Sequence, residues 1–304
     1  MGSDPQGLTP SKRSFFFGCA ARWVFLLASL VAAACPVAAA DPPQRIVSIN
    51  VCADQLVQML APPERVQALS FLAGDPQMSV LATQSGKYRL IRGQAEEVLP
   101  LDADLVIAGV YSTPATVALL RRLGERIEVL PMTNDLDGIR ANVRLVAGWL
   151  GREAEGDHIL ADFDARLADA RPMPGTRRPT AIVYYVNSLT AGRGTLADAV
   201  LTAAGFDNLA AREGVEGEGY LPLERLVADP PDLIVLGNGA QHFKTIIADN
   251  LRHPALHRIL DTVPSVVLPQ ALLMCDTPLV ADAIDRLATA RLLLTKQHYA
   301  GAAP

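Results

Sequence analysis

The sequence lacks the motifs that mark several common enzyme classes. It has no Gly-x-Ser-x-Gly motif, which holds the nucleophile of α/β-hydrolases, and no phosphate-binding loop ending in Gly-Lys-Ser or Gly-Lys-Thr. Its five histidines are scattered, and only His253 and His257 have a spacing that fits one helix face, with Pro254 between them. We therefore expect a protein that is not an enzyme, with no catalytic residues, no cofactor and no metal held by its own side chains.

Positive charge and long apolar runs are also scarce. Residues 41–304 contain 24 basic and 31 acidic side chains, a net charge of −7. An acidic surplus argues against nucleic acid or an anionic membrane surface as a partner. No run of about eighteen apolar residues, the length that spans a bilayer as a helix, occurs in this part of the chain.

Residues 1–40 have the pattern of an export signal. Three basic residues precede an apolar run over Trp23–Ala34, and Ala38–Ala40 fits the small-residue site at which such signals are cleaved. We expect an exported protein with its signal removed near Ala40. An uncleaved anchor, or a lipid anchor on Cys35, is the less favoured alternative.

The rest of the chain alternates short apolar strands with amphipathic helices. This order predicts a mostly parallel sheet with helices on both faces, and therefore an α/β fold. We expect strands at residues 45–49, 66–69, 105–108, 127–130, 180–186, 233–236 and 266–268, and helices at residues 55–60, 114–123, 136–150, 196–204 and 277–294.

Residues 151–173 are predicted to form one amphipathic helix between two halves of the chain. Ile159, Leu160, Phe163 and Leu167 recur at steps of three and four residues, with charged side chains on the other faces. Pro172 and the proline two residues later end the helix, which spans roughly 30 Å. We expect an N-terminal lobe at residues 41–150 and a C-terminal lobe at residues 174–304.

The two halves also resemble each other. Residues 96–109 and 224–237 run in step, with Glu96 over Glu224, Asp104 over Asp232 and a glycine closing each segment. Self-similarity in a fixed order favours a duplicated βα unit. The alternative is that a short helix, an aspartate and a buried strand recur by chance, as they do in many α/β proteins.

The chain resembles a known family in the order of its features, which are the export signal, the two α/β halves, the helical connector and the paired Glu…Asp-Leu motifs. It is that of the periplasmic substrate-binding proteins of ABC importers for siderophores, haem and cobalamin, in its class III form with a helical backbone. The resemblance covers about residues 44–295. It implies two Rossmann-like lobes joined by a single long α-helix, with a ligand cleft between them. We thus expect a periplasmic, monomeric protein that captures an iron chelate (siderophore or haem) or cobalamin and delivers it to the permease.

The resemblance also implies a role for one surface carboxylate on each lobe. In the family such carboxylates dock onto arginines of the membrane permease, and Glu96 and Glu224 stand at the matching positions. Two exposed charges on separate lobes would give an orienting, salt-sensitive contact. The alternative is that each glutamate only stabilises the first turn of a short helix.

Ligand-binding residues are expected in the loops at the carboxyl ends of the strands. The arginines among them are suited to anionic groups such as carboxylates or propionates, and the tyrosines to stacking on a flat ligand or to ligating haem iron. The first half contributes Asn50, Cys52, Lys87, Tyr88, Arg89, Arg92, Tyr111 and Ser112, and the second contributes Asn187, Arg193, Tyr220, Asn238, Gln241, Met274 and Cys275. Cobalamin-binding relatives often line the cleft with tryptophan, and the only one here beyond the signal is Trp149.

Cys52 and Cys275 are the only cysteines after the export signal, and each follows a predicted strand of its own half. Three interpretations stay open: a disulfide that ties the lobes, a thiolate pair that contacts ligand or metal, and two unrelated buried residues. A disulfide requires α-carbons within about 7 Å. We rank it first, slightly ahead of a ligand role.

Two alternatives from other classes also remain. The segment from Gly192 to Ala197 resembles a dinucleotide-binding fingerprint, which would suit an exported α/β enzyme. The match is weak, because five residues separate the segment from the preceding predicted strand. A sensor that binds a ligand and signals, without transporting it, is the other alternative.

Overall fold

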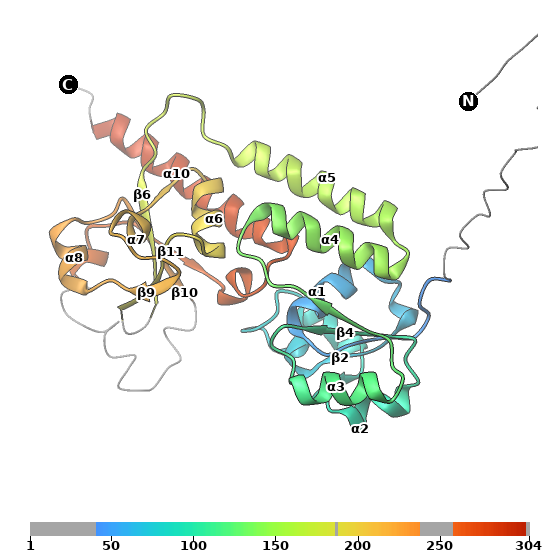
Figure 1. Ribbon diagram of the computed structural model, residues 1–304. Helices are drawn as coiled ribbons and strands as arrows, with labels where there is room; N and C mark the ends of the chain where they lie inside the picture. Colours follow the sequence, from blue (N-terminus) through green and yellow to red (C-terminus); the bar gives the residue numbers. More distant parts are fainter. Residues whose placement is uncertain (1–40, 186–187, 238–257, 302–304) are drawn as a thin grey trace, which may run out of the picture. The chain divides into compact units, whose positions relative to one another are not determined.

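The computed structural model describes residues 41–185, 188–237 and 258–301, which belong to the unit from Asp41 to Pro304 (Figure 1). The expected export signal lies outside the described residues. Among the helices that are described, none is both long enough and apolar enough to cross a membrane.

The first half of this unit builds a five-stranded parallel sheet in the order β3-β2-β1-β4-β5. Helices α1 (Val51–Leu60) and α4 (Leu136–Leu150) pack on one face, and α2 (Ala95–Val98) and α3 (Pro114–Arg122) pack on the other (Figure 1). The strands are β1 (Ile46–Ser48), β2 (Val66–Ser70), β3 (Leu90–Ile91), β4 (Leu105–Gly109) and β5 (Ile127–Leu130).

Strand β4 explains why this sheet is covered on both faces. Successive side chains of a strand point to opposite faces. Leu105 and Ile107 join the core formed with α1 and α4, whereas Val106 and Ala108 join the core formed with α2 and α3. An uninterrupted apolar run is therefore what a central parallel strand requires.

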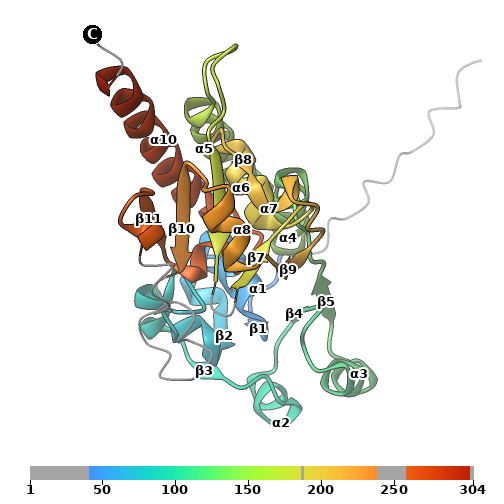
Figure 2. The same ribbon diagram turned by 90° about the vertical axis from the view of Figure 1, so that its left-hand side faces the viewer.

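The second half builds a six-stranded sheet, in which β11-β10-β6-β7-β9 is the main path and β8 pairs with β6. Strand β7 pairs antiparallel with both β6 and β9, and the other pairs are parallel. Figure 2 shows β10 and β11 side by side. The strands are β6 (Thr180–Tyr184), β7 (Leu189–Ala191), β8 (Asp207–Asn208), β9 (Glu218–Tyr220), β10 (Leu233–Gly237) and β11 (Ser265–Leu268). The helices are α6 (Leu196–Ala203), α7 (Leu209–Arg212), α8 (Leu223–Ala228) and α10 (Ala281–Gly301).

Helix α5 (Glu153–Ala170) contributes to the cores of both halves. Its 18 residues span about 27 Å. Leu160 packs in the core of the first half, and Phe163 and Leu167 pack in that of the second. Because residues 41–304 pack as one unit, lobe boundaries at residues 150 and 174 stay a prediction.

The α/β fold class is confirmed, with three differences in detail. The second sheet is not wholly parallel, because the sequence pattern did not reveal β7 and β9, which have only three residues each. Helix α1 begins before residue 55, since Asn50 caps it by accepting the N–H groups of Cys52 and Ala53. The last helix begins at Ala281, because residues 278–280 form a separate 3₁₀ turn.

Candidate functional site

A cavity of about 420 Å³ opens at the carboxyl ends of the first sheet's strands. Segments that follow all five strands line it, because the carboxyl ends of parallel strands share one edge of the sheet. Met274 and Asp276, from the chain between β11 and α10, complete the wall. The lining from the first half comes from residues 49–52, 70–72, 92–93, 109–113 and 130–132, together with Met78.

The exposed surface of this cavity is mainly apolar and aromatic. Tyr111 is 79% exposed, and Phe71 and Met132 are each 52% exposed. The Tyr111 hydroxyl donates a hydrogen bond to Met132 Sδ at 3.2 Å, and the Arg92 guanidinium lies 5.9 Å from the centre of the Phe71 ring. Exposed apolar groups gathered around a cavity favour binding of a ligand with large apolar faces.

The polar side chains at the inner wall bind the protein's own backbone. Asn50 Oδ1 accepts the N–H of Cys52 at 3.0 Å and thereby starts α1. Ser112 Oγ accepts the N–H of Gly109 at 3.1 Å and donates to the carbonyl oxygen of Ile49 at 3.3 Å. A β-carbon at Gly109 would lie 2.4 Å from Asn50 Cγ, so any larger residue there would displace the side chain that caps α1.

Three consecutive residues, Cys275, Asp276 and Thr277, bind the second half to the first; we call them the 275–277 clasp. Cys275 forms a disulfide with Cys52, and their α-carbons are 5.1 Å apart. The Thr277 hydroxyl donates to Gln55 Oε1 at 3.2 Å. One wall of the cavity therefore lies where the second half is bonded to the first.

Asp276 is the central residue of the clasp and an ionisable group of the cavity wall. Its Oδ2 accepts the N–H of Thr133 at 2.9 Å and Nδ2 of Asn142 at 2.8 Å. Burial raises the pKa of Asp276, and these hydrogen bonds oppose that rise. The carboxylate therefore joins the clasp to the loop after β5 and to α4.

The family model of the periplasmic binding proteins matches residues 61–263, more than half of the chain. The chain belongs to this family. The expected resemblance is therefore confirmed. This periplasmic binding protein has the two-lobed α/β fold of the class III members.

Several relatives and solved structures are similar to this periplasmic binding protein. A cobalamin-binding protein of Halobacterium salinarum is 28% identical over 207 residues, which cover 65% of this chain and 55% of the relative; the chain thus spans about half of that relative's length. A periplasmic haem-binding protein of Pseudomonas aeruginosa is 26% identical, with a TM-score of 0.63 over 82% of this chain and 92% of that one. The haem-binding protein RhuT of Roseiflexus is 24% identical, with a TM-score of 0.66 over 83% and 98% of the two chains. At 24% identity, the similarity to RhuT shows a shared fold alone.

The structure brings part of the predicted ligand set together. The expected residues that line the cavity are Asn50, Cys52, Arg92, Tyr111, Ser112 and Met274. The others with a described position are not part of this lining: Lys87, Tyr88, Arg89, Arg193, Tyr220 and Cys275, the last of which is bonded to Cys52. Asn187, Asn238 and Gln241 lie outside the described residues, as do His253 and His257.

The residues outside the cavity have other contacts. Tyr88 packs against the core formed by α1 and α4, and the Lys87 ammonium lies 5.0 Å from its ring. Arg193 forms an ion pair with Glu216 at 3.1 Å. Tyr220 lies in β9, an antiparallel strand, so the rule of parallel carboxyl ends does not place it at the cavity.

Sequence reasoning missed several lining residues, above all Phe71, Leu72, Met132 and Asp276. Phe71 and Leu72 follow β2, and Met132 follows β5. The carboxyl-end rule would have selected them if it had been applied to every predicted strand. For Asp276, the only signal was its place next to Cys275.

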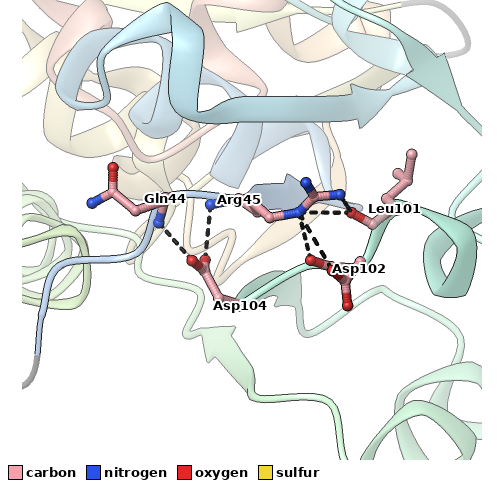
Figure 3. A network of polar contacts seen from close by, with 5 residues as sticks. All are labelled: Gln44, Arg45, Leu101, Asp102 and Asp104. Atoms are coloured by element: carbon pink, nitrogen blue, oxygen red, sulfur yellow. Dashed lines mark hydrogen bonds and ion pairs between the residues drawn. The ribbon is translucent and has the colours of Figure 1, made fainter.

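The repeat that the sequence indicates has a structural counterpart in two aspartates. Asp104 accepts the N–H groups of Gln44 at 2.6 Å and of Arg45 at 3.0 Å, just before β1 (Figure 3). Asp232 accepts the N–H of Thr180 at 2.7 Å, at the start of β6. In each half, the aspartate that precedes one strand (β4 or β10) thus accepts backbone N–H groups at the start of the parallel strand beside it (β1 or β6).

The two glutamates of the repeat also occupy equivalent positions. Glu96 is the second residue of α2, and Glu224 is the second residue of α8. Both side chains are exposed, and within the described part of the chain neither forms a hydrogen bond or ion pair. Glu97 has a different role, because its Oε2 accepts the N–H groups of Arg92 and Gln94 and caps α2.

The segment from Gly192 to Ala197 does not have the features of a nucleotide-binding loop. It connects β7 to α6, and β7 is antiparallel to its neighbours. The N–H of Gly194 already donates to the Asp198 carboxylate at 3.2 Å, and the Thr195 hydroxyl accepts the N–H of Asp198. A carboxylate at the helix start competes with a phosphate for these donors. The enzyme alternative is not favoured.

Proposed function

We propose that this protein is the periplasmic solute-binding component of an ABC importer and that its cargo is a metal chelate with large flat faces, haem or a corrinoid. The family and its relatives support a solute-binding role, since similar proteins are named for haem and for cobalamin. An export signal in residues 1–40 would deliver the protein to the periplasm.

The single observation that carries the ligand class is the cavity at the ends of β1 to β5. Phe71, Tyr111 and Met132 expose apolar surface there, and Arg92 is the one arginine among the described residues that line it. A macrocycle offers flat apolar faces to such a surface and places its few anionic groups at the rim. Ferric siderophores with several anionic groups fit less well, because Arg92 is the only described arginine in the lining and Arg89 and Arg193 are not part of it.

Tyr111 has a specific role in this proposal. A phenol oxygen can ligate haem iron, and within the described ranges the Tyr111 hydroxyl has only a thioether, Met132 Sδ, as its hydrogen-bond partner. A thioether is a weak acceptor that a ligand displaces readily. For haem, Tyr111 would hold the metal; for a corrinoid, its ring would stack on the macrocycle.

The test is a titration of the mature protein with haemin, cyanocobalamin and a ferric hydroxamate siderophore, followed by calorimetry and thermal shift. We expect haemin or cyanocobalamin to bind and to stabilise the fold, by about 2.7 kcal/mol at a hundredfold excess over Kd. Tyr111→Ala should weaken binding at least tenfold, by analogy with a lost aromatic contact of about 1.5 kcal/mol. Tyr220→Ala, an exposed tyrosine outside the cavity, is the control and should bind as the wild type does. Binding of the siderophore alone, or equal effects of the two variants, would refute the proposal.

Delivery to the permease is the second part of the proposal. Glu96 and Glu224 are exposed at the same position of the short helices α2 and α8. We infer that each carboxylate pairs with a basic group of the permease, which would orient the loaded protein.

A further inference from the structure

One buried carboxyl group lies directly behind the cavity wall and takes no part in the contacts considered so far. Asp54 is in the first turn of α1 and is 0% exposed. The same helix begins with Val51 and Cys52, which line the cavity. Asp54 therefore belongs to an element that forms part of the wall.

The Asp54 carboxyl group joins this helix to a second wall segment. The Ser70 hydroxyl donates to Asp54 Oδ2 at 2.5 Å, and the Ser70 N–H donates to Asp54 Oδ1 at 3.2 Å. Ser70 is the last residue of β2 and lines the cavity together with Phe71 and Leu72. One side chain thus connects the start of α1 to the segment that carries an exposed aromatic ring.

We propose that Asp54 is a positioning residue for ligand binding: it clamps residues 70–72 against α1, and its charge state sets how firmly this wall is held. The proposal concerns the cavity assigned above and rests on its role in ligand binding. Asp54 acts through Ser70 and needs no contact with the ligand.

The chemistry of the clamp explains why charge matters. An ionised carboxylate accepts both the hydroxyl and the amide of Ser70, and such charge-assisted bonds are about twice as strong as neutral ones. Once protonated, one carboxyl oxygen becomes a donor and the other a weaker acceptor. The clamp on residues 70–72 is therefore tight when Asp54 is charged and loose when it is neutral.

The surroundings of Asp54 place the change of charge close to neutral pH. Burial raises the pKa of Asp54 to about 7, and hydrogen bonds from Ser48 and Ser70 oppose this rise. The groups that face it are the Ser48 hydroxyl from β1 and the Ser70 hydroxyl and amide from β2; no charged side chain among the described residues adds to the shift. The wall loosens as the pH falls through this range, so we expect ligand affinity to fall with it.

The first test compares the pH profile of binding in the wild type and in Asp54→Asn, which keeps the shape of the side chain but has no charge. With haemin and cyanocobalamin as separate probes, wild-type affinity should fall about tenfold between about pH 8.5 and pH 5.5, the effect of losing one charged hydrogen bond. Asp54→Asn should bind weakly at all pH values with a flatter profile. Glu153→Gln, an exposed acid in the first turn of α5, is the control and should keep the wild-type profile.

The second test needs no ligand and measures hydrogen–deuterium exchange of residues 70–72, corrected for the intrinsic pH dependence of exchange. Protection of the Ser70 amide should be lower in Asp54→Asn than in the wild type at high pH and equal at low pH. If Asp54→Asn does not fold, Ser70→Ala removes only the hydroxyl and should reduce protection of residues 71 and 72. Protection that depends on neither pH nor these variants overturns the clamp. Protection that follows the prediction while neither probe binds supports the clamp and refutes the ligand class.

Discussion

The polar side chains that shape the cavity bind the backbone of the protein itself. Asn50 caps α1, Ser112 connects the loops after β1 and β4, and Asp276 accepts an N–H from the loop after β5. Their hydrogen-bonding capacity is thus largely used before any ligand arrives. A wall that is already ordered lowers the entropic cost of binding, so the ligand meets a preorganised surface.

At this scale, stability should depend on pH through Asp54. Its pKa is raised from 3.8 to about 7, so the unfolded chain releases this proton at a lower pH than the folded protein does. The contribution of the Asp54 proton to the free energy of unfolding is full below about pH 4. It is lost as the pH rises toward 7, which lowers the free energy of unfolding by on the order of 4 kcal/mol. Denaturant unfolding at a series of pH values should show Asp54→Asn gaining stability relative to the wild type as pH rises. A constant difference between the two proteins would contradict the buried titration. Affinity is expected to move in the opposite direction, which separates the two effects.

At the scale of elements, the repeat that the sequence indicates corresponds to two similar short helices. Helices α2 and α8 each precede a central strand, β4 and β10, and each presents a glutamate at its second position. The aspartates that hold β1 and β6 follow at the same distance along the chain. This equivalence favours a shared docking role for the two glutamates over the alternative that each one independently stabilises its own helix.

Reversing both charges should separate docking from ligand binding. Glu96→Lys with Glu224→Lys is expected to abolish uptake in cells, because both contacts to the permease become repulsive. Ligand affinity of the purified protein should not change, since neither residue lines the cavity. Glu64→Lys with Asp261→Lys changes the net charge equally at two other exposed positions and is the control. Unchanged uptake by the Glu96 and Glu224 variant would refute the assignment.

Two glycines in neighbouring helices should respond to alanine in opposite ways. A β-carbon at Gly156 of α5 would lie 2.8 Å from the Ala147 β-carbon of α4, whereas one at Gly148 of α4 meets nothing within 4 Å. Gly148→Ala should raise the free energy of unfolding by about 0.5 to 1 kcal/mol through helix propensity. Gly156→Ala should lower it by about 1 kcal/mol, because crowding of the two helices outweighs that gain. Chemical denaturation measures both, and the same sign for both variants would show that α4 and α5 pack less closely.

At the scale of the whole molecule, the 275–277 clasp and α5 both join the two halves. The clasp does so beside the cavity, through a disulfide and the hydrogen bonds of Asp276 and Thr277. Helix α5 does so by packing in both cores and through Arg166, which binds Asp285 on α10. Two connections of this kind restrict how far the halves can separate.

Removal of the disulfide should release part of this restriction. Cys52→Ser with Cys275→Ser is expected to lower the free energy of unfolding by about 3 kcal/mol and to broaden the range of distances between the halves. Spin labels on exposed positions of α3 and α8 report these distances, and the reduced wild type should match the variant. Mass analysis with and without reductant checks the bond itself, and two free thiols would exclude it.

Local patterns predicted most of the elements but only part of the cavity. Helix α4 begins and ends where expected, because Asp135 caps its start and Gly151 ends it with φ 63°. Strands of two or three residues, such as Leu90–Ile91, have too few side chains to show a period. Arg193 and Tyr220 are not in the cavity lining: Tyr220 lies in β9, which is antiparallel to β7, and Arg193 follows β7, so the carboxyl-end rule for parallel strands does not place them there. Their role in ligand binding stays a prediction.

The sequence by itself determined the α/β order and most of the helices and strands, because these depend on the spacing of residues a few positions apart. It also indicated the repeat, because two segments run in step at a constant offset. Only the tertiary structure decided which distant side chains meet. Cys52 and Cys275, 223 residues apart, are neighbours because the chain after β11 reaches the edge where the strands of the first sheet end and places Met274 and Asp276 in the cavity wall there. Asp54 meets Ser70 because β2 lies beside β1 in the order β3-β2-β1-β4-β5. Strand order follows from how the whole chain buries its apolar faces, so no local pattern contains it.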